Sequence, residues 1–308
     1  MRVLVTGGSG FIGSHVVDQL LVHEHEPVIL DTRLSPHHPG VASVVGDMTD
    51  AETILGAVRD VDAIVHLAAV ADVNDVVVDP VRASFVNVHG TQMVLEAARH
   101  GNVRRVVYAS TVWVYGNAPV EGDLDEDAPL AHPSHVYTAT KLAGEMYCTA
   151  YGELYGVESA ILRFGIPYGP RARPAAVIPS FVARAQHGDT LTIAGDGNQT
   201  RQFVYVEDLA EGVVLALQQG SAQRVYNLVG DEETSVQQIA DTVRAIVGDV
   251  AVVHGPERPA DVRLGYVSGS RAAAELGWAA ATNFNEGVRR YVDWLSLADR
   301  LPATVARQ

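Results

Sequence analysis

Short apolar runs alternate with longer amphipathic stretches through the first half of the chain. The runs are rich in Val, Ile and Leu and predict β-strands at residues 2–6, 28–31, 44–46, 63–67, 105–109 and 159–163. Stretches such as 81–100 carry apolar residues at helical spacing and predict helices. Strands that are apolar on both faces and separated by helices indicate a parallel sheet covered on both sides. The pattern therefore predicts an α/β fold with a doubly wound parallel sheet.

The pattern changes beyond Phe164, where prolines break the chain into loops and short elements. We expect a first domain over residues 1–165 and a smaller C-terminal lobe over residues 166–201 and 223–308. An apolar strand and a helix within residues 202–222 are expected to return to the main sheet. The sequence thus predicts one large sheet with a second, smaller unit beside it.

Composition and charge narrow the class of protein. The chain of 308 residues carries a formal net charge of -15, and a surface of that sign would not attract nucleic acid or an anionic membrane. Cys148 is the single cysteine, which excludes internal disulfides and cysteine-based zinc sites and suits a reducing compartment. No apolar run approaches the ~18 residues of a membrane span, and the first strand begins without a signal peptide. We expect a cytoplasmic protein and predict no metal site.

A glycine-rich stretch, TGGSGFIG at residues 6–13, joins the first predicted strand to a helix. Its spacing fits both G-x-x-G-x-x-G and G-x-G-x-x-G. Glycine lets the chain turn sharply and brings the backbone close to a phosphate. The helix that begins near Phe11 would point amide groups and the positive end of its dipole at that phosphate. From this stretch alone, a tight turn without a ligand remains the alternative.

Asp31 indicates which nucleotide the turn would hold. It ends the second predicted strand 18 residues after Gly13, about where a dinucleotide site places a carboxylate for the ribose hydroxyls. Arg33 could accept a 2′-phosphate, but Asp31 would repel that phosphate, so NAD is favoured over NADP. Asp47 and Met48 follow the third strand and could lie near an adenine, although Asp47 could equally cap the next helix.

A second group of polar residues suggests chemistry. Tyr137 and Lys141 lie four residues apart on a predicted helix and so can share one face. A nearby ammonium would lower the pKa of the phenol and make Tyr137 a usable general base. Ser110 and Thr111 stand at the carboxyl end of a predicted strand, the edge where doubly wound sheets bind ligands. The alternatives are a chance pair on a solvated helix and a hydroxyl that caps a turn.

Together these motifs resemble the extended short-chain dehydrogenase/reductases, most of all the NAD-dependent nucleotide-sugar epimerase/dehydratase group and its UDP-sugar 4-epimerases. The resemblance covers nearly the whole chain. It rests on TGGSGFIG at 6–13, Asp31, GDM at 46–48, HLAA at 66–69, N-x-x-G-T from Asn87, Ser110 with Thr111, and Y-x-x-x-K from Tyr137. It implies that the first domain is an NAD-binding Rossmann domain and that the lobe binds the nucleotide sugar.

The resemblance also assigns roles to residues. Tyr137 would be the catalytic base, Lys141 would bind the nicotinamide ribose and tune the phenol, and Thr111 would hydrogen-bond the reacting sugar hydroxyl. The residues that would bind NAD are Gly7, Gly10, Phe11, Ile12, Gly13, Asp31, Arg33, Asp47, Met48, Leu67, Ala68, Ala69, Asn87, Ser110, Tyr137, Lys141 and Phe164.

Substrate residues follow from the same resemblance. Segments 195–203 and 258–262 resemble nucleotide-diphosphate segments, in which Arg201 and Arg258 would clamp the diphosphate because a guanidinium fits it. Two surface arginines are the alternative reading. The substrate-binding residues expected are Thr111, Ile166, Arg173, Val177, Thr192, Arg201, Arg258 and Asp261. Ile166 departs from many relatives, which carry an Asn there.

Two features suggest which reaction is catalysed. Dehydratases of this group usually have an Asp-Glu pair directly after the catalytic Thr, whereas Val112 and Trp113 stand there in this chain. We therefore expect reversible oxidation at C4 and epimerisation through a 4-keto intermediate. Arg173 resembles an arginine that some uronic-acid 4-epimerases use for the sugar carboxylate. Both UDP-glucose/galactose and UDP-glucuronate/galacturonate thus stay open as substrates.

Other functions remain to be distinguished. A nucleotide-4-keto-sugar reductase would use NAD(P)H and share the Tyr and Lys, whereas an NAD-sensing regulator would keep the glycine loop without needing the catalytic residues. The resemblance further suggests a homodimer formed through the helices near residues 81–100 and 137–155.

Overall fold

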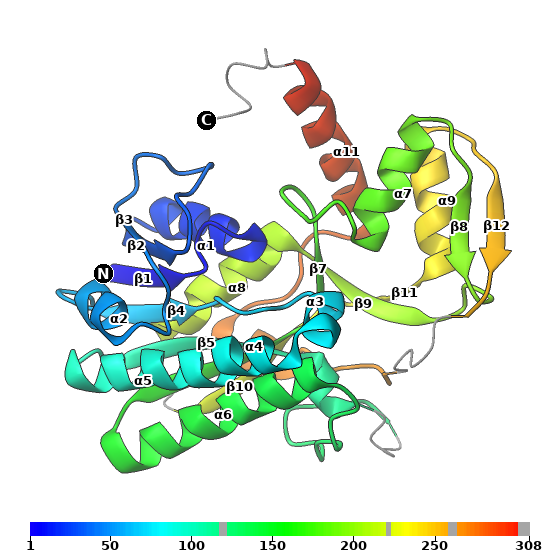
Figure 1. The fold of residues 1–308 in the computed structure, drawn as a ribbon. Helices are drawn as coiled ribbons and strands as arrows, with labels where there is room; N and C mark the ends of the chain where they lie inside the picture. Colours follow the sequence, from blue (N-terminus) through cyan, green and yellow to red (C-terminus); the bar gives the residue numbers. More distant parts are fainter. Residues whose placement is uncertain (117–121, 220–222, 258–263, 301–308) are drawn as a thin grey trace.

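The computed structural model describes residues 1–116, 122–219, 223–257 and 264–300 (Figure 1). A seven-stranded parallel sheet runs through its larger part in the order β10-β6-β5-β4-β1-β2-β3. Its strands are β1 (Arg2–Thr6), β2 (Glu26–Asp31), β3 (Ser43–Val45), β4 (Ala63–His66), β5 (Arg105–Thr111), β6 (Glu158–Phe164) and β10 (Arg224–Leu228). The prediction of a doubly wound parallel sheet is confirmed.

Helices cover both faces of this sheet, because successive residues of each strand are apolar and point to opposite sides. Val3 and Val5 pack with α1 and α8, whereas Leu4 between them packs with α2, α5 and α6. These elements and the short helices beside them are α1 (Phe11–Val22), α2 (Ala51–Ala57), α3 (Val73–Val78), α4 (Pro80–Ser84), the π-helix η1 (Phe85–His89), α5 (Gly90–His100), the 3₁₀ helix η2 (Val112–Tyr115), α6 (Val136–Tyr155), α8 (Val206–Gln219) and α10 (Ser270–Leu276).

The smaller lobe has its own core. Its two small sheets have the strand orders β11-β9-β7 and β12-β8, and helices α7, α9 and α11 pack against them (Figure 1). The elements are β7 (Ile166–Tyr168), α7 (Val177–Gln186), β8 (Leu191–Ala194), β9 (Thr200–Tyr205), β11 (Glu233–Ser235), α9 (Val236–Val247), β12 (Val252–Gly255) and α11 (Phe284–Arg300). Ser235 and Gln238 form a capping box that fixes the start of α9.

One sheet assignment from the sequence is wrong. The strand in residues 202–222 was expected to join the main sheet, but β9 pairs with β7 and β11 in the lobe. The strand that joins the main sheet is β10, which pairs with β6 in parallel and lies within the range 223–308 assigned to the lobe. Helix α8 does pack against α1, and it connects β9 in the lobe to β10 in the main sheet. Both strands are short and mix polar with apolar residues, so their sequences alone do not distinguish the two sheets.

Candidate active site

The glycine loop has the geometry of a turn that only glycine can make. Gly7 has a φ of 74°, and a Cβ there would lie 2.8 Å from the Ala68 amide nitrogen. A Cβ on Gly13 would lie 2.2 Å from the Gly7 carbonyl oxygen. Gly10 precedes α1 and, having no side chain, leaves the first amides of that helix uncapped. These amides and the close-packed glycines fit a pyrophosphate of a dinucleotide.

Asp31 lies beside the glycine loop, as the sequence predicts. Its carboxylate accepts a hydrogen bond from the Ser9 amide at 3.1 Å. The Ser9 hydroxyl donates to the Arg33 carbonyl at 2.9 Å, so the end of β2 is tied to the loop. The strand order reverses between β1 and β4, which places the glycine loop after β1 at the reversal point and Asp31 on the neighbouring strand β2. Doubly wound sheets bind their ligands at such points.

Asp47, which follows β3, does not cap the next helix. Asp47 accepts hydrogen bonds from the amide and hydroxyl of Thr49, whereas Asp50 is the N-cap of α2. Met48 is buried against Gly90 on η1–α5. The adenine contact of Asp47 and Met48 therefore stays a prediction, and the reading of Asp47 as a helix cap is wrong.

A chain of hydrogen bonds links the glycine loop to the helices on the other side of β4. The Thr91 hydroxyl donates to the Asn87 carbonyl at 2.6 Å, so its oxygen accepts from His66 Nε2 at 2.9 Å. His66 Nδ1 must then accept from the Thr6 hydroxyl at 2.7 Å, and that oxygen accepts from the Ala68 amide at 3.3 Å. Burial lowers the pKa of His66 to about 3, so the ring is neutral in this one tautomer.

Asn87 extends this network to the helix of the predicted base. It lies in the π-helix η1, a wide turn that is frequent at functional sites. Its amide nitrogen donates to the Val70 carbonyl and to the Thr140 hydroxyl, both at 3.0 Å. The Thr140 hydroxyl donates in turn to the Tyr137 carbonyl at 2.7 Å. The position of Tyr137 is thus tied to the loop after β4, where Leu67, Ala68 and Ala69 lie.

Tyr137 and Lys141 share a face of α6, but their side chains differ from the expectation. The Lys141 ammonium donates to the Ala109 carbonyl at 2.9 Å, and burial lowers its pKa to about 8. Burial raises the pKa of Tyr137 to about 12, and the cation that opposes this rise is Arg173. The expectation that Lys141 lowers the pKa of Tyr137 is therefore wrong for this structure, because the long lysine side chain extends inward to β5.

Ser110 and Thr111 end β5 beside this helix. The Thr111 oxygen accepts from the Trp113 amide at 3.3 Å, which caps η2 and leaves its hydroxyl proton available to a ligand. Ser110 donates its hydroxyl to Glu145, which forms a buried ion pair with Arg163 at 2.8 Å. Phe164 is the β6 residue that pairs with Thr111. Thr111 therefore has a proton for chemistry, whereas the Ser110 hydroxyl is engaged inside the protein.

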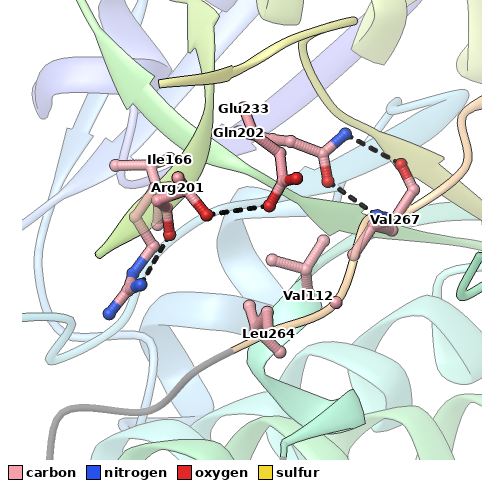
Figure 2. A pocket seen from close by; sticks show the side chains of 9 residues that line it. Val112, Ile166, Arg201, Gln202, Glu233, Leu264 and Val267 are labelled. Carbon is pink, nitrogen blue, oxygen red and sulfur yellow. Dashed lines mark hydrogen bonds between the residues drawn. The ribbon is translucent and has the colours of Figure 1, made fainter. Parts of the chain in front are cut away.

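A small pocket lies between the end of β5 and the lobe (Figure 2). One wall is apolar, and the polar residues on the other side include Arg201 and the hydrogen-bonded pair Thr200 and Glu233. The lining residues are Val112, Ile166, Thr200, Arg201, Gln202, Glu233, Leu264, Gly265 and Val267. Gln202 holds the far side together by donating to the Gly230 and Val267 carbonyls. Two predicted substrate residues, Ile166 and Arg201, thus line one pocket together with Val112, the residue after Thr111.

The other predicted substrate residues are placed differently. Arg173 forms an ion pair with Asp72. Val177 begins α7 and Thr192 lies on β8 as an exposed residue, and neither lines the pocket among the described residues. Arg258 and Asp261 lie outside the described residues. The structure therefore brings Ile166 and Arg201 together, but not Val177 or Thr192 with them.

His135 is a residue of the site that the sequence pattern did not single out. Its ring accepts a hydrogen bond from the Thr138 amide at 3.4 Å and so caps α6. The ring also stacks on Tyr137, with centroids 6.3 Å apart, and meets the edge of Trp113 at 5.0 Å. A polar residue just before a predicted helix is the signal that could have found it. His135 and Trp113 thus form a group of aromatic rings that packs against Tyr137.

The fold and this edge of the sheet define a Rossmann-type, dinucleotide-binding enzyme class. A family model for the NAD dependent epimerase/dehydratase family matches residues 3–229. The chain belongs to this family, and the predictions of the family, of an enzyme and of NAD as the cofactor are confirmed. In the described part of the chain, no helix has the length and apolar character needed to cross a membrane.

Several relatives and solved structures resemble the whole chain. The UDP-glucose 4-epimerase of Mycolicibacterium smegmatis is 36% identical over 96% of this chain and 98% of that protein. The dTDP-D-glucose 4,6-dehydratase of Mus musculus is 31% identical over 95% of this chain and 88% of that protein. A Thermotoga maritima UDP-glucose 4-epimerase with UDP-glucose has a TM-score of 0.92, at 29% identity, 97% coverage of this chain and 100% of that one.

One further structure bears on acidic sugars. MoeE5 in complex with UDP-glucuronic acid and NAD has a TM-score of 0.89 and is 30% identical, over 97% of this chain and 100% of that one. Proteins similar to this chain are thus named for epimerisation and for dehydration, and similar solved structures hold a neutral or an acidic nucleotide sugar.

Proposed function

We propose that the protein is an NAD-dependent C4 epimerase of a nucleotide-diphosphate sugar. The observation that carries this proposal is that Thr111 ends β5 while Lys141, four residues after Tyr137 on α6, donates to the Ala109 carbonyl of the same strand. Apolar residues follow Thr111 directly. The names of relatives matched over their whole length support it. Both relatives are named for UDP-glucose, so we propose uridine diphosphate as the nucleotide part of the substrate.

The residues of the loop would hold NAD, which accepts and returns a hydride when bound. Its pyrophosphate would lie on the amides after Gly10, its adenosine ribose on Asp31, and its nicotinamide ribose near Lys141. The fit rests on the tightly packed turn at Gly7 and Gly13, where any Cβ would clash with backbone atoms. The domain made of residues 1–165, α8 and β10 is the one we propose for this role.

Tyr137 would move the proton in the reaction. Its phenolate would take the proton of the sugar 4-hydroxyl as C4 is oxidised. It would return the proton after the 4-keto sugar has rotated in the pocket to present its other face. Thr111 would hold the same hydroxyl with its available proton. Because burial raises the pKa of Tyr137 to about 12, positive charge near the phenol is needed, and Arg173 supplies some of it.

Loss of water is disfavoured by the residues around Thr111. Elimination needs an acid beside the sugar, but Val112 is buried and Trp113 packs on His135. The Glu145 carboxylate forms an ion pair with Arg163 and accepts a hydrogen bond from the Ser110 hydroxyl. A carboxylate engaged in this way cannot also protonate a leaving hydroxyl.

We further propose a homodimer in the cytoplasm. Large apolar side chains are exposed on the helices that were expected to form the dimer, including Val81 on α4 and Leu154 on α6, which are 79% and 72% exposed. Exposed apolar surface of this kind marks interaction sites. The acidic chain and its one buried cysteine fit a reducing compartment.

The proposal is tested by incubating the protein with NAD and a panel of UDP, dTDP and CDP sugars and following the sugar by NMR. Inversion at C4 without net reduction of NAD supports it. A product that has lost water identifies a dehydratase, and consumption of NADPH with a 4-keto sugar identifies a reductase. Full biological activity of Tyr137→Phe would identify a non-enzymatic regulator instead.

A further inference from the structure

An ion pair connects the two sides of the site. Asp72 caps α3, just after the loop at residues 67–69, and accepts from the Asn74 amide at 2.9 Å. Its other carboxylate oxygen accepts from Arg173, which lies between β7 and α7 in the lobe. Figure 1 shows α3 at the edge of the main sheet that faces β7. The pair thus spans from the cofactor side of the site to the substrate side.

This pair contributes little to stability. The Arg173 and Asp72 side chains are 56% and 26% exposed, so water and salt screen their attraction. Arg173 nevertheless acts on the predicted base, because burial raises the pKa of Tyr137 and the Arg173 charge lowers it by a smaller amount. One member of the pair is therefore coupled to the predicted base.

The backbone that carries Arg173 is fixed independently of Asp72. Arg171 donates to Asp18 on α1 at 2.6 Å. The neighbouring Pro170 carbonyl accepts from His15 Nε2 at 2.9 Å, and burial lowers the pKa of His15 to about 4, so this ring is neutral. Removal of the Asp72 charge should therefore leave the backbone at Arg173 in place.

We propose that Asp72 is a specificity-determining residue that favours neutral sugars over uronic acids by pairing with Arg173. This inference rests on the proposed function. A sugar carboxylate that approaches Arg173 would also approach Asp72, and the like charges repel. A neutral sugar meets no such repulsion. Without the Asp72 charge, Arg173 would be an unpaired guanidinium, which binds a carboxylate well.

The test compares Asp72→Asn with the unchanged protein. Asn caps a helix as well as Asp does, so α3 should persist while the charge is lost. The matched control is Asp79→Asn, because Asp79 caps α4 through the Arg82 amide at 2.9 Å and has the same chemistry. For each protein, kcat/KM is measured with UDP-glucuronate and with UDP-glucose.

We expect Asp72→Asn to raise the ratio of kcat/KM for UDP-glucuronate over UDP-glucose about 10-fold or more, as removal of one repelling charge allows. Asp79→Asn should leave the ratio unchanged, and adding Arg173→Ala to Asp72→Asn should abolish the gain. An unchanged ratio in Asp72→Asn, an equal gain in the control, or a gain that survives loss of Arg173 would each overturn the proposal.

Failure of the proposed function would look different. In that case the unchanged protein epimerises neither sugar, and the same variants are compared by calorimetric titration with UDP-glucuronate and UDP-glucose. A selective gain in UDP-glucuronate affinity in Asp72→Asn still supports the role of Asp72. Equal affinity changes for both ligands, or no change, contradict it.

Discussion

The Lys141 ammonium donates to the carbonyl of Ala109 at 2.9 Å, which directs this side chain into the core of the protein. The ammonium also lies over the ring of Tyr108, 5.2 Å from its centroid. Burial lowers the pKa of Lys141 to about 8, so a charged group is held in a place where charge is costly. A buried charge that lowers stability is typical of a residue that is retained for function.

Replacement of Lys141 by Met should therefore stabilise the protein while abolishing turnover. The gain in unfolding free energy at pH 7 is about 3 kcal/mol, the order expected for a pKa lowered from 10.5 to about 8. Below pH 8 both states of the unchanged protein hold the proton, so the gain is complete there. It should shrink as the pH rises from 8 to 10.5, because the folded lysine then loses its proton first. Denaturant unfolding at several pH values measures this, and a variant less stable than the parent at pH 7 would contradict it.

His66 should make the stability of the fold sensitive to acid. Its pKa falls to about 3 on folding, from 6.5, so the unfolded chain binds the proton first. The stability that the neutral ring contributes is complete above pH 6.5 and is lost as the pH falls toward 3. Because His15 behaves in the same way, His66→Asn should reduce the slope of stability against pH by about one proton rather than remove it. An unchanged slope would show that His66 does not titrate as described.

Thr140 should act on turnover through the position of Tyr137. Thr140→Val removes the hydroxyl that joins Asn87 to the Tyr137 carbonyl, and we expect kcat to fall about 10-fold or more, since small misplacements of catalytic groups are costly. Thr149→Val is the matched control, because the Thr149 hydroxyl also bonds a carbonyl of α6, that of Glu145. Equal effects of the two variants on kcat would show that the network near the site has no special role.

The glycine loop gives the sharpest prediction about the cofactor. Gly13→Ala places a Cβ against the Gly7 carbonyl, 2.2 Å away, and should abolish NAD binding or prevent folding. Gly56→Ala is the control, because its Cβ meets nothing within 4 Å on α2. That change should stabilise the protein by about 0.5–1 kcal/mol, as Ala does in place of Gly within helices. Retained NAD affinity in Gly13→Ala, measured by titration, would exclude the loop as the cofactor site.

The sequence predicted those parts of the site in which one motif defines one local geometry. The turn at Gly7 and Gly13 requires glycine at both positions. Asp31 could be predicted because it ends the next strand 18 residues after Gly13. The sequence could not distinguish β9 from β10, because both strands are short with mixed polar and apolar residues and only tertiary pairing separates them. Asp72 was missed for the same reason, since its partner Arg173 lies 101 residues away along the chain.

The direction of the Lys141 side chain could not be read from spacing either. Helical periodicity gives the face that a residue occupies, but the contact made by a long side chain depends on what lies beneath that face. In this protein it is the Ala109 carbonyl at the end of β5. The chemistry of the candidate site was thus predictable by residue type, and its electrostatics only from the structure.

The central claim is most directly tested by NMR in heavy water. The protein is incubated with UDP-glucose and with UDP-glucuronate in the presence of catalytic NAD, and the sugar C4 position is followed. We predict inversion at C4 with the original hydrogen retained there, because the hydride leaves C4 and returns to it within one cycle. Formation of a 6-deoxy-4-keto sugar, loss of carbon dioxide, or release of one NADH per product would contradict the account.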